Sequence, residues 1–159
     1  MKEITEPKEV ILKHFIDSIT IQKYIQKENS VVDVGTGAGF PGIPLNIVNN
    51  EAKYTLVDSL NKRIKFLDEI IDKLNLKNIE TVHSRAEDFA KENRETYDVA
   101  TSRAVAALNV LLEYLLPLVK VGGLCICMKG LNVQEEIEAA SNALKILGGQ
   151  IEKVEQITL

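Results

Sequence analysis

Apolar positions along the chain follow two periods in turn, and this alternation predicts a sheet covered by helices. Short runs rich in β-branched residues predict strands at 31–35, 54–58, 79–83, 97–101, 124–128 and 150–157. Apolar positions three and four apart predict helices at 42–48, 61–76, 86–92, 108–116 and 133–147. Nearly continuous apolar strands that alternate with helices are typical of a mostly parallel sheet with helices on both faces. The fold class is therefore α/β.

A helical lead-in is predicted over residues 6–27, before the first strand. Its apolar positions are expected to face inward, and they are Val10, Ile11, Leu12, Phe15, Ile16, Ile19, Tyr24 and Ile25. His14 lies on this apolar face, and we interpret it as a packing histidine. The chain is expected to form a single domain over 1–159, with the lead-in at 1–28 and a ligand-binding core at 29–159.

The loop after the first strand is the most informative stretch. Residues 31–45 read VVDVGTGAGFPGIPL, with four glycines in eight positions followed by prolines at the start of a helix. Glycine allows sharp turns and close approach of a ligand to bare peptide. Proline is tolerated in a first helical turn, where its missing N–H costs little. Gly35, Gly37 and Gly39 are thus candidates for a nucleotide-type cofactor site.

Two registers of the glycine pattern are possible. Counting from Gly37 gives GAGFPG, the dinucleotide-binding pattern, with Asp58 at the distance of a ribose-binding acid. Counting from Gly35 gives DVGTGAG, the pattern of S-adenosylmethionine enzymes. Because the strand ends at Gly35, Gly37 is late for a dinucleotide turn. No lysine follows in the P-loop position, which excludes that class.

Polar residues follow several predicted strands. They are Asp33, Asp58, the segment 84–87, Ser102 and Arg103. Ligands of open parallel sheets bind at the carboxyl ends of the strands, near the point where the strand order reverses. We therefore expect these residues to converge on one crevice.

Composition narrows the function classes. The net charge of −4 argues against a nucleic-acid partner, unless a local basic patch such as Lys62, Arg63 and Lys65 supplies the contact. Apolar stretches are too short to span a bilayer, and no secretory signal opens the chain. Cys125 and Cys127 alternate on one strand face, where core packing is expected, so a reducing cytoplasmic location is predicted. No metal ligand set is recognised.

The chain resembles a known family in five core segments and the lead-in. The core segments are DVGTGAGFPGIPL, LVDSLNKRIKFLDEI, SRAEDF, YDVATSRAVA and GGLCICMKG, and the lead-in is TEPKEVILKHFIDSI. They resemble the bacterial small-subunit guanine-N7 methyltransferases, also known as glucose-inhibited division protein B. The resemblance implies a class I methyltransferase fold, S-adenosyl-L-methionine as donor, and N7 of a guanine in 16S rRNA of the small ribosomal subunit as acceptor. A monomer is expected.

The same resemblance implies specific cofactor-binding positions. Gly35 and Phe40 come from the glycine loop, Ala86 and Glu87 follow the third strand, and Arg103 follows the fourth. Asp58 corresponds to the acid that such folds use on the ribose hydroxyls. Guanine N7 has no proton to lose, so no general base is required and no catalytic residue is assigned. Arg103 has a possible positioning role, through the methionine carboxylate or a phosphate.

Structural roles remain open for the same side chains. Asp58, with Ser59, has the chemistry to cap the helix at Asn61, and Glu87 is a charge favoured near a helix N-terminus. Arg103 has the alternative of a surface ion pair. Lys129 either faces RNA, helps to close the pocket or is solvated.

Two departures from the family pattern affect the prediction. The chain begins late and stops after 150–157, without the family's final antiparallel strand and basic tail. We therefore expect the strand at 150–157 to be disordered or displaced, and RNA affinity is in question.

Two other functions are alternatives to the methyltransferase: an NAD-dependent oxidoreductase and a non-catalytic cofactor-binding module.

Overall fold

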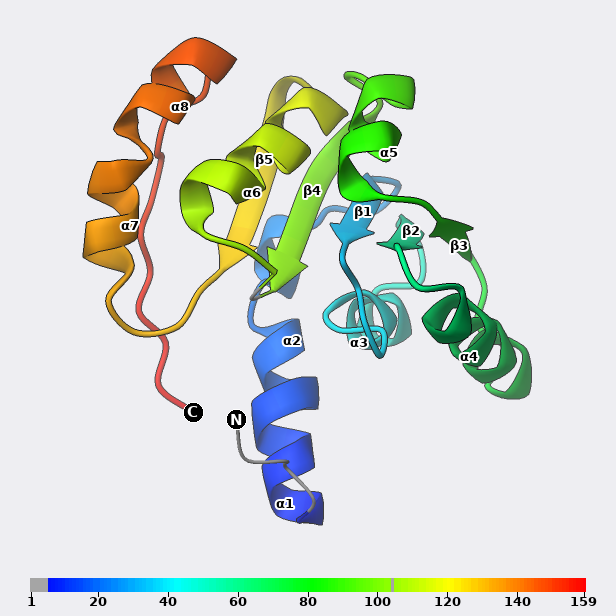
Figure 1. Cartoon of the computed structure of the whole chain (residues 1–159). Helices are drawn as coiled ribbons and strands as arrows, with labels where there is room; N and C mark the ends of the chain where they lie inside the picture. The colour runs from blue at the N-terminus through cyan, green and yellow to red at the C-terminus, as the bar shows by residue number, and fades with distance from the viewer. Residues whose placement is uncertain (1–5, 104) are drawn as a thin grey trace.

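A parallel sheet forms the centre of the computed structural model, which describes residues 6–103 and 105–159. Within these residues the sheet has five strands in the order β3-β2-β1-β4-β5 (Figure 1). The strands are β1 Ser30–Val34, β2 Lys53–Asp58, β3 Ile79–His83, β4 Tyr97–Arg103 and β5 Val119–Met128. All neighbouring strands pair in parallel. The strand order reverses between β1 and β4, which lie side by side.

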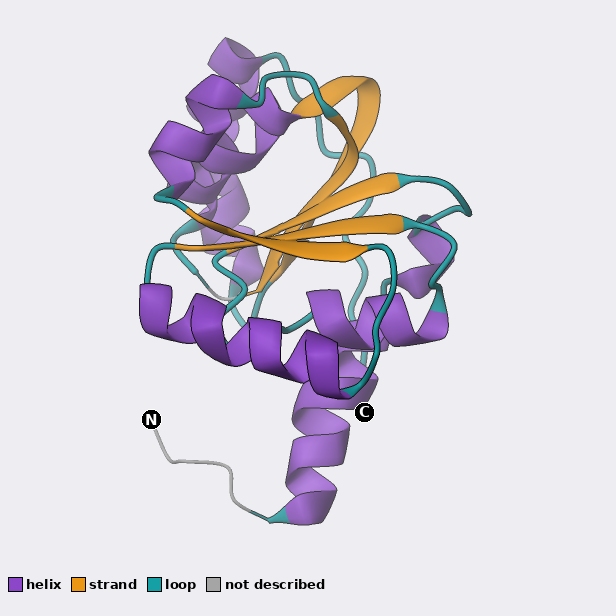
Figure 2. Ribbon diagram, turned by 90° about the vertical axis from the view of Figure 1, so that its right-hand side faces the viewer, coloured by secondary structure: helices purple, strands orange, loops and turns teal. Residues whose placement is uncertain are grey.

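Helices cover both faces of the sheet (Figure 2). The helices nearest the sheet are α3 Gly42–Val48, α4 Asn61–Lys73, α5 Ala86–Glu92 and α6 Leu108–Leu115. Val32 and Val34 of β1 pack in one cluster with α5 and α6, while Val31 packs with α3. Successive side chains of a strand point to opposite faces, so an unbroken apolar strand requires cover on both sides. The predicted α/β class is confirmed.

The local pattern of apolar residues predicted the bounds of most elements closely. The predicted helices at 42–48 and 86–92 and the strand at 79–83 have the bounds of α3, α5 and β3. Helix α4 ends three residues before the predicted limit, and Leu74 is 56% exposed. These elements are short and have a clear apolar periodicity, which explains why their bounds could be predicted from the sequence.

Strand β5 begins five residues before its predicted start. Tyr97 pairs with Val119, but Val99 pairs with Leu124, so the register shifts between them. Gly122 and Gly123 lie inside this irregularity instead of forming a turn before the strand. A bulge of this kind commonly contains glycine because its backbone bends sharply.

The predicted helix at 133–147 is divided into α7 Val133–Ala139 and α8 Ser141–Leu147. Ala140 lies between them, fully buried, and packs in a cluster with Leu108 and Leu112 of α6. Gly148 ends α8 in the left-handed conformation, as expected for a helix terminator.

The strand predicted at 150–157 is wrong: these described residues form no strand. The segment instead leads from the end of α8 toward the N-terminal helical segment (Figure 1). Its Glu155 carboxylate lies 2.6 Å from Lys23 Nζ and also accepts a hydrogen bond from the Tyr24 hydroxyl. The expected displacement of this segment from the sheet is confirmed.

The N-terminal helical segment projects from the body of the molecule (Figures 1 and 2). It comprises α1 Pro7–Val10, the π-helix η1 Ile11–Ile16, α2 Asp17–Ile19 and the 3₁₀ turn η2 Gln22–Tyr24. Ile25 is buried against the sheet, as predicted, and so is Ile21. Ile11, Phe15 and Ile16 are 52%, 39% and 37% exposed, so their predicted inward orientation is wrong. Only the C-terminal part of the segment reaches the sheet.

Residues 1–5 of the predicted lead-in and the side chain of Leu12 lie outside the described part of the structure. None of the helices in the described part has both the length and the apolar character needed to cross a membrane.

Candidate functional site

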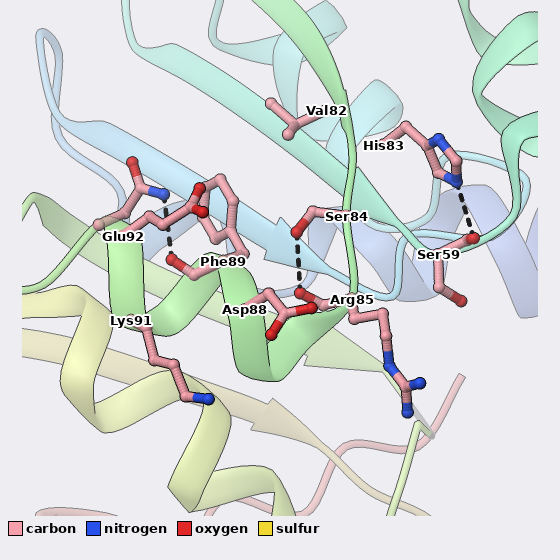
Figure 3. A pocket seen from close by; sticks show the side chains of 10 residues that line it. Ser59, Val82, His83, Ser84, Arg85, Asp88, Phe89, Lys91 and Glu92 are labelled. Carbon is pink, nitrogen blue, oxygen red and sulfur yellow. Dashed lines mark hydrogen bonds between the residues drawn. The ribbon is translucent and has the colours of Figure 1, made fainter.

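A groove lies on the outer side of the carboxyl ends of β2 and β3 (Figure 3). Its volume is about 670 Å³, and its wall mixes the cations Arg85 and Lys91 with the anions Asp88 and Glu92. The His83 ring turns toward Ser59, with Nε2 at 3.0 Å from the Ser59 carbonyl oxygen. The groove has no consistent charge, and it shares Arg85 with a second hollow.

That second hollow lies where the strand order reverses, between the ends of β1, β2 and β4. Its volume is about 630 Å³. The predicted site residues that line it are Gly35, Asp58, Ala86, Glu87 and Arg103. We call it the switch-point cavity. Residues from four separate segments meet there, as expected for an open parallel sheet.

Gly35 forms the bare peptide wall of the switch-point cavity. Its φ of 68° lies in the left-handed region, and a Cβ added to it would lie 2.6 Å from Cγ2 of Val105. Its N–H donates to the Val57 carbonyl oxygen at 2.8 Å, which joins the loop to β2. Any other residue would be strained and would collide with the opposite wall.

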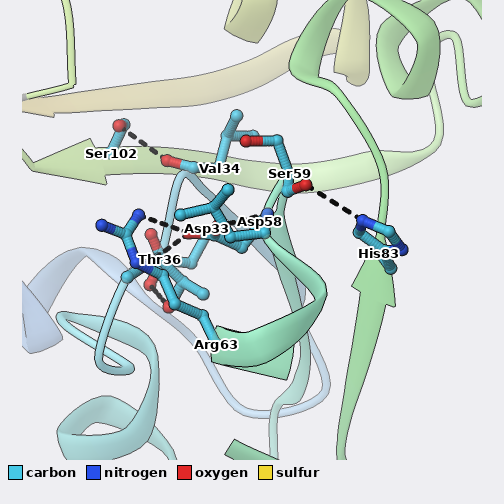
Figure 4. A network of polar contacts seen from close by, with 10 residues as sticks. Asp33, Val34, Thr36, Asp58, Ser59, Arg63, His83 and Ser102 are labelled. Atoms are coloured by element: carbon cyan, nitrogen blue, oxygen red, sulfur yellow. Dashed lines mark hydrogen bonds and ion pairs between the residues drawn. The ribbon is translucent and has the colours of Figure 1, made fainter. Parts of the chain in front are cut away.

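Asp58 connects the glycine loop to the end of β2 (Figure 4). Oδ2 accepts the Gly37 N–H at 2.9 Å and lies 3.5 Å from Nη1 of Arg63, while Oδ1 accepts the Leu60 N–H at 3.0 Å. The N-cap of α4 is Leu60 and has no side-chain cap, so the capping role considered for Asp58 and Ser59 is wrong. Two hydrogen bonds leave part of the acceptor capacity of an ionised carboxylate unused.

Asp33 does not line the cavity but closes the glycine loop onto α3. Its Oδ2 accepts the Thr36 hydroxyl at 2.8 Å and the Gly42 N–H at 2.9 Å. Its Oδ1 is buried with no hydrogen-bond partner among the described residues. Burial raises the pKa of this carboxyl to about 7, against the hydrogen bonds from Thr36 and Gly42.

The predicted convergence on one crevice was therefore wrong for Asp33 and Ser102. The Ser102 hydroxyl donates to the Val34 carbonyl oxygen at 2.8 Å and joins β4 to β1 beneath the cavity (Figure 4). The Asp33 side chain points to the face covered by α3, and the Ser102 side chain points to the opposite face, with Cys127. A list of strand-end residues does not reveal these orientations.

Ala86 and Glu87 begin α5 at the far wall of the cavity. The Glu87 carboxylate accepts a hydrogen bond from the Tyr114 hydroxyl at 3.4 Å and lies 3.8 Å from Nη2 of Arg85. Its own backbone N–H, more than Arg85, holds the pKa of Glu87 below its usual value. This position suits both a ligand acceptor and a helix N-terminal charge.

Arg103 leaves β4 toward the N-terminal helical segment. Its guanidinium donates to the Lys13 carbonyl oxygen at 3.2 Å and to Asp17 Oδ2 at 3.4 Å, and Nη2 lies 3.0 Å from His14 Nδ1. Only 19% of the side chain is exposed, so the surface ion pair considered as an alternative becomes a partly buried one.

Phe40 and Gly39 also belong to the glycine loop but make other contacts. The Phe40 ring packs on His14, with 5.2 Å between ring centroids, and Cζ of Arg103 lies 5.2 Å from the same ring. A Cβ on Gly39 would lie 2.5 Å from Cδ1 of Ile43, so this glycine permits close packing on α3.

Several cavity residues were not predicted as ligand contacts, and three of them have contacts that shape the cavity. Val105 faces Gly35, Arg63 pairs with Asp58, and Arg85 lines both hollows. Arg63 had been identified as part of a basic patch, and Arg85 lies within the strand-end segment 84–87. For Val105, the sequence held no indication of a place in the cavity besides its position two residues after β4.

Other candidates have structural contacts. Lys129 Nζ donates to the Ala106 carbonyl oxygen at 2.6 Å and lies 3.0 Å from Glu136 Oε1, with 12% of its side chain exposed, so it is not solvated. The Cys125 and Cys127 thiols are free and pack on the core, as predicted. Burial raises their pKa values to about 12 and 11. Across the described residues, no cluster of three or more His, Cys, Asp or Glu is arranged for a metal ion.

Known proteins resemble this chain along nearly its whole length. The sequence model of the family described as "rRNA small subunit methyltransferase G" matches residues 1–158. "Ribosomal RNA small subunit methyltransferase G" of Oenococcus oeni is 58% identical over 153 residues, covering 93% of this chain and 63% of that protein. The Acetivibrio thermocellus protein of the same name is 56% identical over 159 residues, covering 98% and 65%. The chain thus spans about two thirds of the length of these relatives.

Solved structures share the fold. A SAM dependent methyltransferase from Aquifex aeolicus has a TM-score of 0.60 at 25% identity, covering 90% of this chain and 83% of that one. Pyrococcus horikoshii TYW2 in complex with MeSAdo has a TM-score of 0.72 at 17% identity, covering 92% and 55%. The fold is that of the class I methyltransferases.

Proposed function

Because the chain belongs to the rRNA small subunit methyltransferase G family, we propose that it binds S-adenosyl-L-methionine and methylates N7 of a guanine in 16S rRNA. The observation that carries the proposal is the switch-point cavity. Gly35, Asp58 and Arg103, three residues of the predicted donor site, line it together with the start of α5.

The residues of the cavity fit an adenosyl donor. Gly35 lines the cavity with bare peptide, and Val105 faces it so closely that an added Cβ would lie 2.6 Å from the valine side chain. The Asp58 carboxylate keeps acceptor capacity for the two ribose hydroxyls. The backbone of Ala86 and the Glu87 carboxylate would contact the adenine edge at the opposite wall. When bound, S-adenosylmethionine supplies an electrophilic methyl group on a positively charged sulfur.

The chain's contribution to the reaction is positioning and electrostatics. Guanine N7 carries a free lone pair and no proton, so no side chain has to act as a base. We assign the predicted donor-binding role to Gly35, Asp58, Ala86, Glu87 and Arg103, acting directly at the cavity. Gly37, Gly39 and Phe40 are assigned to shaping the loop: Gly37 through Asp58, Gly39 through Ile43 and Phe40 through Arg103.

We further propose that residues 1–159 act as one domain, in which 1–28 lead into the core at 29–159. The buried contacts of Ile21 and Ile25 with Val31 and Tyr54 support this division, because the lead-in shares a cluster with the sheet.

Two measurements test the proposed function. Calorimetric titration of the 159-residue chain should show binding of S-adenosylmethionine and S-adenosylhomocysteine but no binding of NAD. Radiolabelled methyl transfer to 30S subunits that lack the modification should then label guanine N7, with the longer Oenococcus oeni relative as positive control. Binding of NAD alone, or well-folded protein that binds neither adenosyl compound, would overturn the proposal.

A further inference from the structure

The side chain of Arg103 joins two parts of the molecule that are far apart in sequence. It leaves the end of β4, lines the switch-point cavity, and makes its polar contacts with residues 13–17. One of these contacts is to a main-chain carbonyl oxygen, at Lys13. The other two depend on side chains, His14 and Asp17.

The same helical segment packs on the glycine loop. The His14 ring stacks on Phe40 with an interplanar angle of 23°, and Phe15 meets Phe40 edge-on at 89°. Because Arg103 also lies over the Phe40 ring, His14 contacts both the guanidinium and the loop residue that the guanidinium covers.

The contact between His14 and Arg103 has a defined polarity. A guanidinium has only donors, so the Nδ1 atom at 3.0 Å from Nη2 has to act as the acceptor. Burial and the neighbouring Arg103 lower the pKa of His14, and Lys13 adds to this, while Asp17 opposes it. The imidazole is therefore neutral at pH 7, as the hydrogen bond requires.

We propose that His14 is a positioning residue for donor binding: its Nδ1 fixes the Arg103 guanidinium against Phe40, so that the N-terminal helical segment holds one wall of the switch-point cavity in place. This inference rests on the proposed function for its ligand. It assigns to the lead-in helix a role in donor affinity, although the helix itself contributes no residue to the cavity lining described.

Two substitutions separate the two contacts of His14. His14→Asn keeps an acceptor oxygen near the place of Nδ1 but loses the ring. His14→Phe keeps a ring that stacks on Phe40 but loses the acceptor. Lys13→Ala is the matched control, because the Lys13 side chain is 56% exposed and its contact with Arg103 is made by the main chain.

The first readout is the dissociation constant for S-adenosylmethionine and for S-adenosylhomocysteine, measured by calorimetry on the whole chain. His14→Phe should weaken both by about tenfold, the effect of one lost hydrogen bond to a charged group. His14→Asn should stay within about threefold of the parent chain, and Lys13→Ala should leave affinity unchanged. Parent-like affinity of His14→Phe, or equal losses in both His14 variants, would overturn the inference.

The second readout is pH. Protonated His14 would place two cations in contact, so donor affinity of the parent chain should fall as the pH is lowered below 6.5, relative to His14→Asn. The charged groups facing His14 are Arg103, Asp17 and Lys13. Parallel pH profiles in both proteins would contradict the role assigned to Nδ1.

The third readout does not require a donor. Amide hydrogen exchange of residues 11–19 should be faster in His14→Phe than in Lys13→Ala, because the helix loses its contact with Arg103. If the parent chain binds no adenosyl compound, the proposed function fails, and the exchange result still decides whether His14 docks the helix. Equal exchange in the two variants would refute that docking role.

Discussion

At the scale of single residues, two buried acids at the ends of neighbouring strands have different roles. Asp58 is 3% exposed and faces the cavity, where Gly37, Leu60 and Arg63 surround its carboxylate. Asp33 is 1% exposed and faces α3, with one oxygen unpartnered among the described residues. Asp33 pairs with Leu56, two residues before Asp58, so strand alternation places both acids on the same face of the sheet. Their roles differ because Asp33 lies within β1 against α3, whereas Asp58 is the last residue of β2, at the cavity.

The buried Asp33 carboxyl should make stability depend on pH in an unusual direction. Its pKa rises from 3.8 to about 7 in the folded chain, so between these values the folded state holds a proton that the unfolded state has released. This contribution to stability is full below pH 3.8 and is lost as the pH rises to 7. Asp33→Asn should remove that loss, which amounts to a few kcal/mol at most.

Urea unfolding of both proteins from pH 4 to pH 8 checks this prediction. The difference in unfolding free energy between Asp33→Asn and the parent chain should increase with pH in favour of the variant. Asp88→Asn, a change of an exposed acid in α5, is the control and should show no such trend. A pH-independent difference for Asp33→Asn would contradict the raised pKa.

Removing the Arg103 side chain should lower methyl transfer strongly while the domain stays folded. Arg103→Ala loses the contacts with Lys13, His14 and Asp17 and opens a wall of the cavity, so we expect at least a tenfold lower rate under subsaturating donor. Radiolabelled transfer measures the rate, and circular dichroism follows the fold. Arg94→Ala, at an exposed position, is the control. Near-normal transfer by Arg103→Ala would remove this residue from the site.

At the scale of elements, the packing of α4 on the core depends on one face of the helix. Leu67 is fully buried and packs with Ile43, Leu56 and Ile64, whereas its neighbour Phe66 is 49% exposed. The pattern of positions three and four apart indicated this face, although the exposed Leu74 shows that the last turn extends past the core.

Two adjacent substitutions test the packing of α4. Leu67→Ala should destabilise the domain by about 2–5 kcal/mol, because it removes a buried side chain and leaves a cavity. Phe66→Ala should change stability by no more than about 0.5 kcal/mol, as expected for an exposed position. Chemical denaturation of both variants gives the comparison, and similar losses from the two changes would show that α4 packs differently.

At the scale of the whole molecule, the two ends of the described chain meet through a few polar contacts. Glu155 bonds to Lys23 and Tyr24, more than 130 residues away in sequence, and these contacts lower the pKa of its carboxyl to about 2. Residues 149–159 form no regular secondary structure, so this cluster is the described anchor of the segment next to the N-terminal helix.

Glu155→Gln should loosen that segment without unfolding the domain. The charge-assisted contact with Lys23 is lost, so trypsin should cleave after Lys153 faster than in the parent chain, while the thermal transition stays in place. Glu152→Gln, at a neighbouring exposed position, provides the comparison. Unchanged cleavage would mean that Glu155 does not hold the segment.

The sequence alone determined the local elements and the chemistry of the loop. Apolar periodicity identified β1 and β3, α3 and α5. The glycine pattern, the strand ends and the resemblance to the methyltransferase family identified five residues that line one cavity: Gly35, Asp58, Ala86, Glu87 and Arg103. These features depend on near neighbours in the chain and on the rule that parallel strands present their carboxyl ends at one edge. Both are readable without coordinates.

Tertiary structure decided everything that depends on a distant partner. The segment 150–157 has only a weak alternation, and a strand cannot form without a neighbour that receives its hydrogen bonds. The exposure of Phe15, the inward turn of Asp33 and the contact of His14 with Arg103 follow from how far each element reaches over the sheet. Packing between segments sets these outcomes, because each side chain's environment is built by residues elsewhere in the chain.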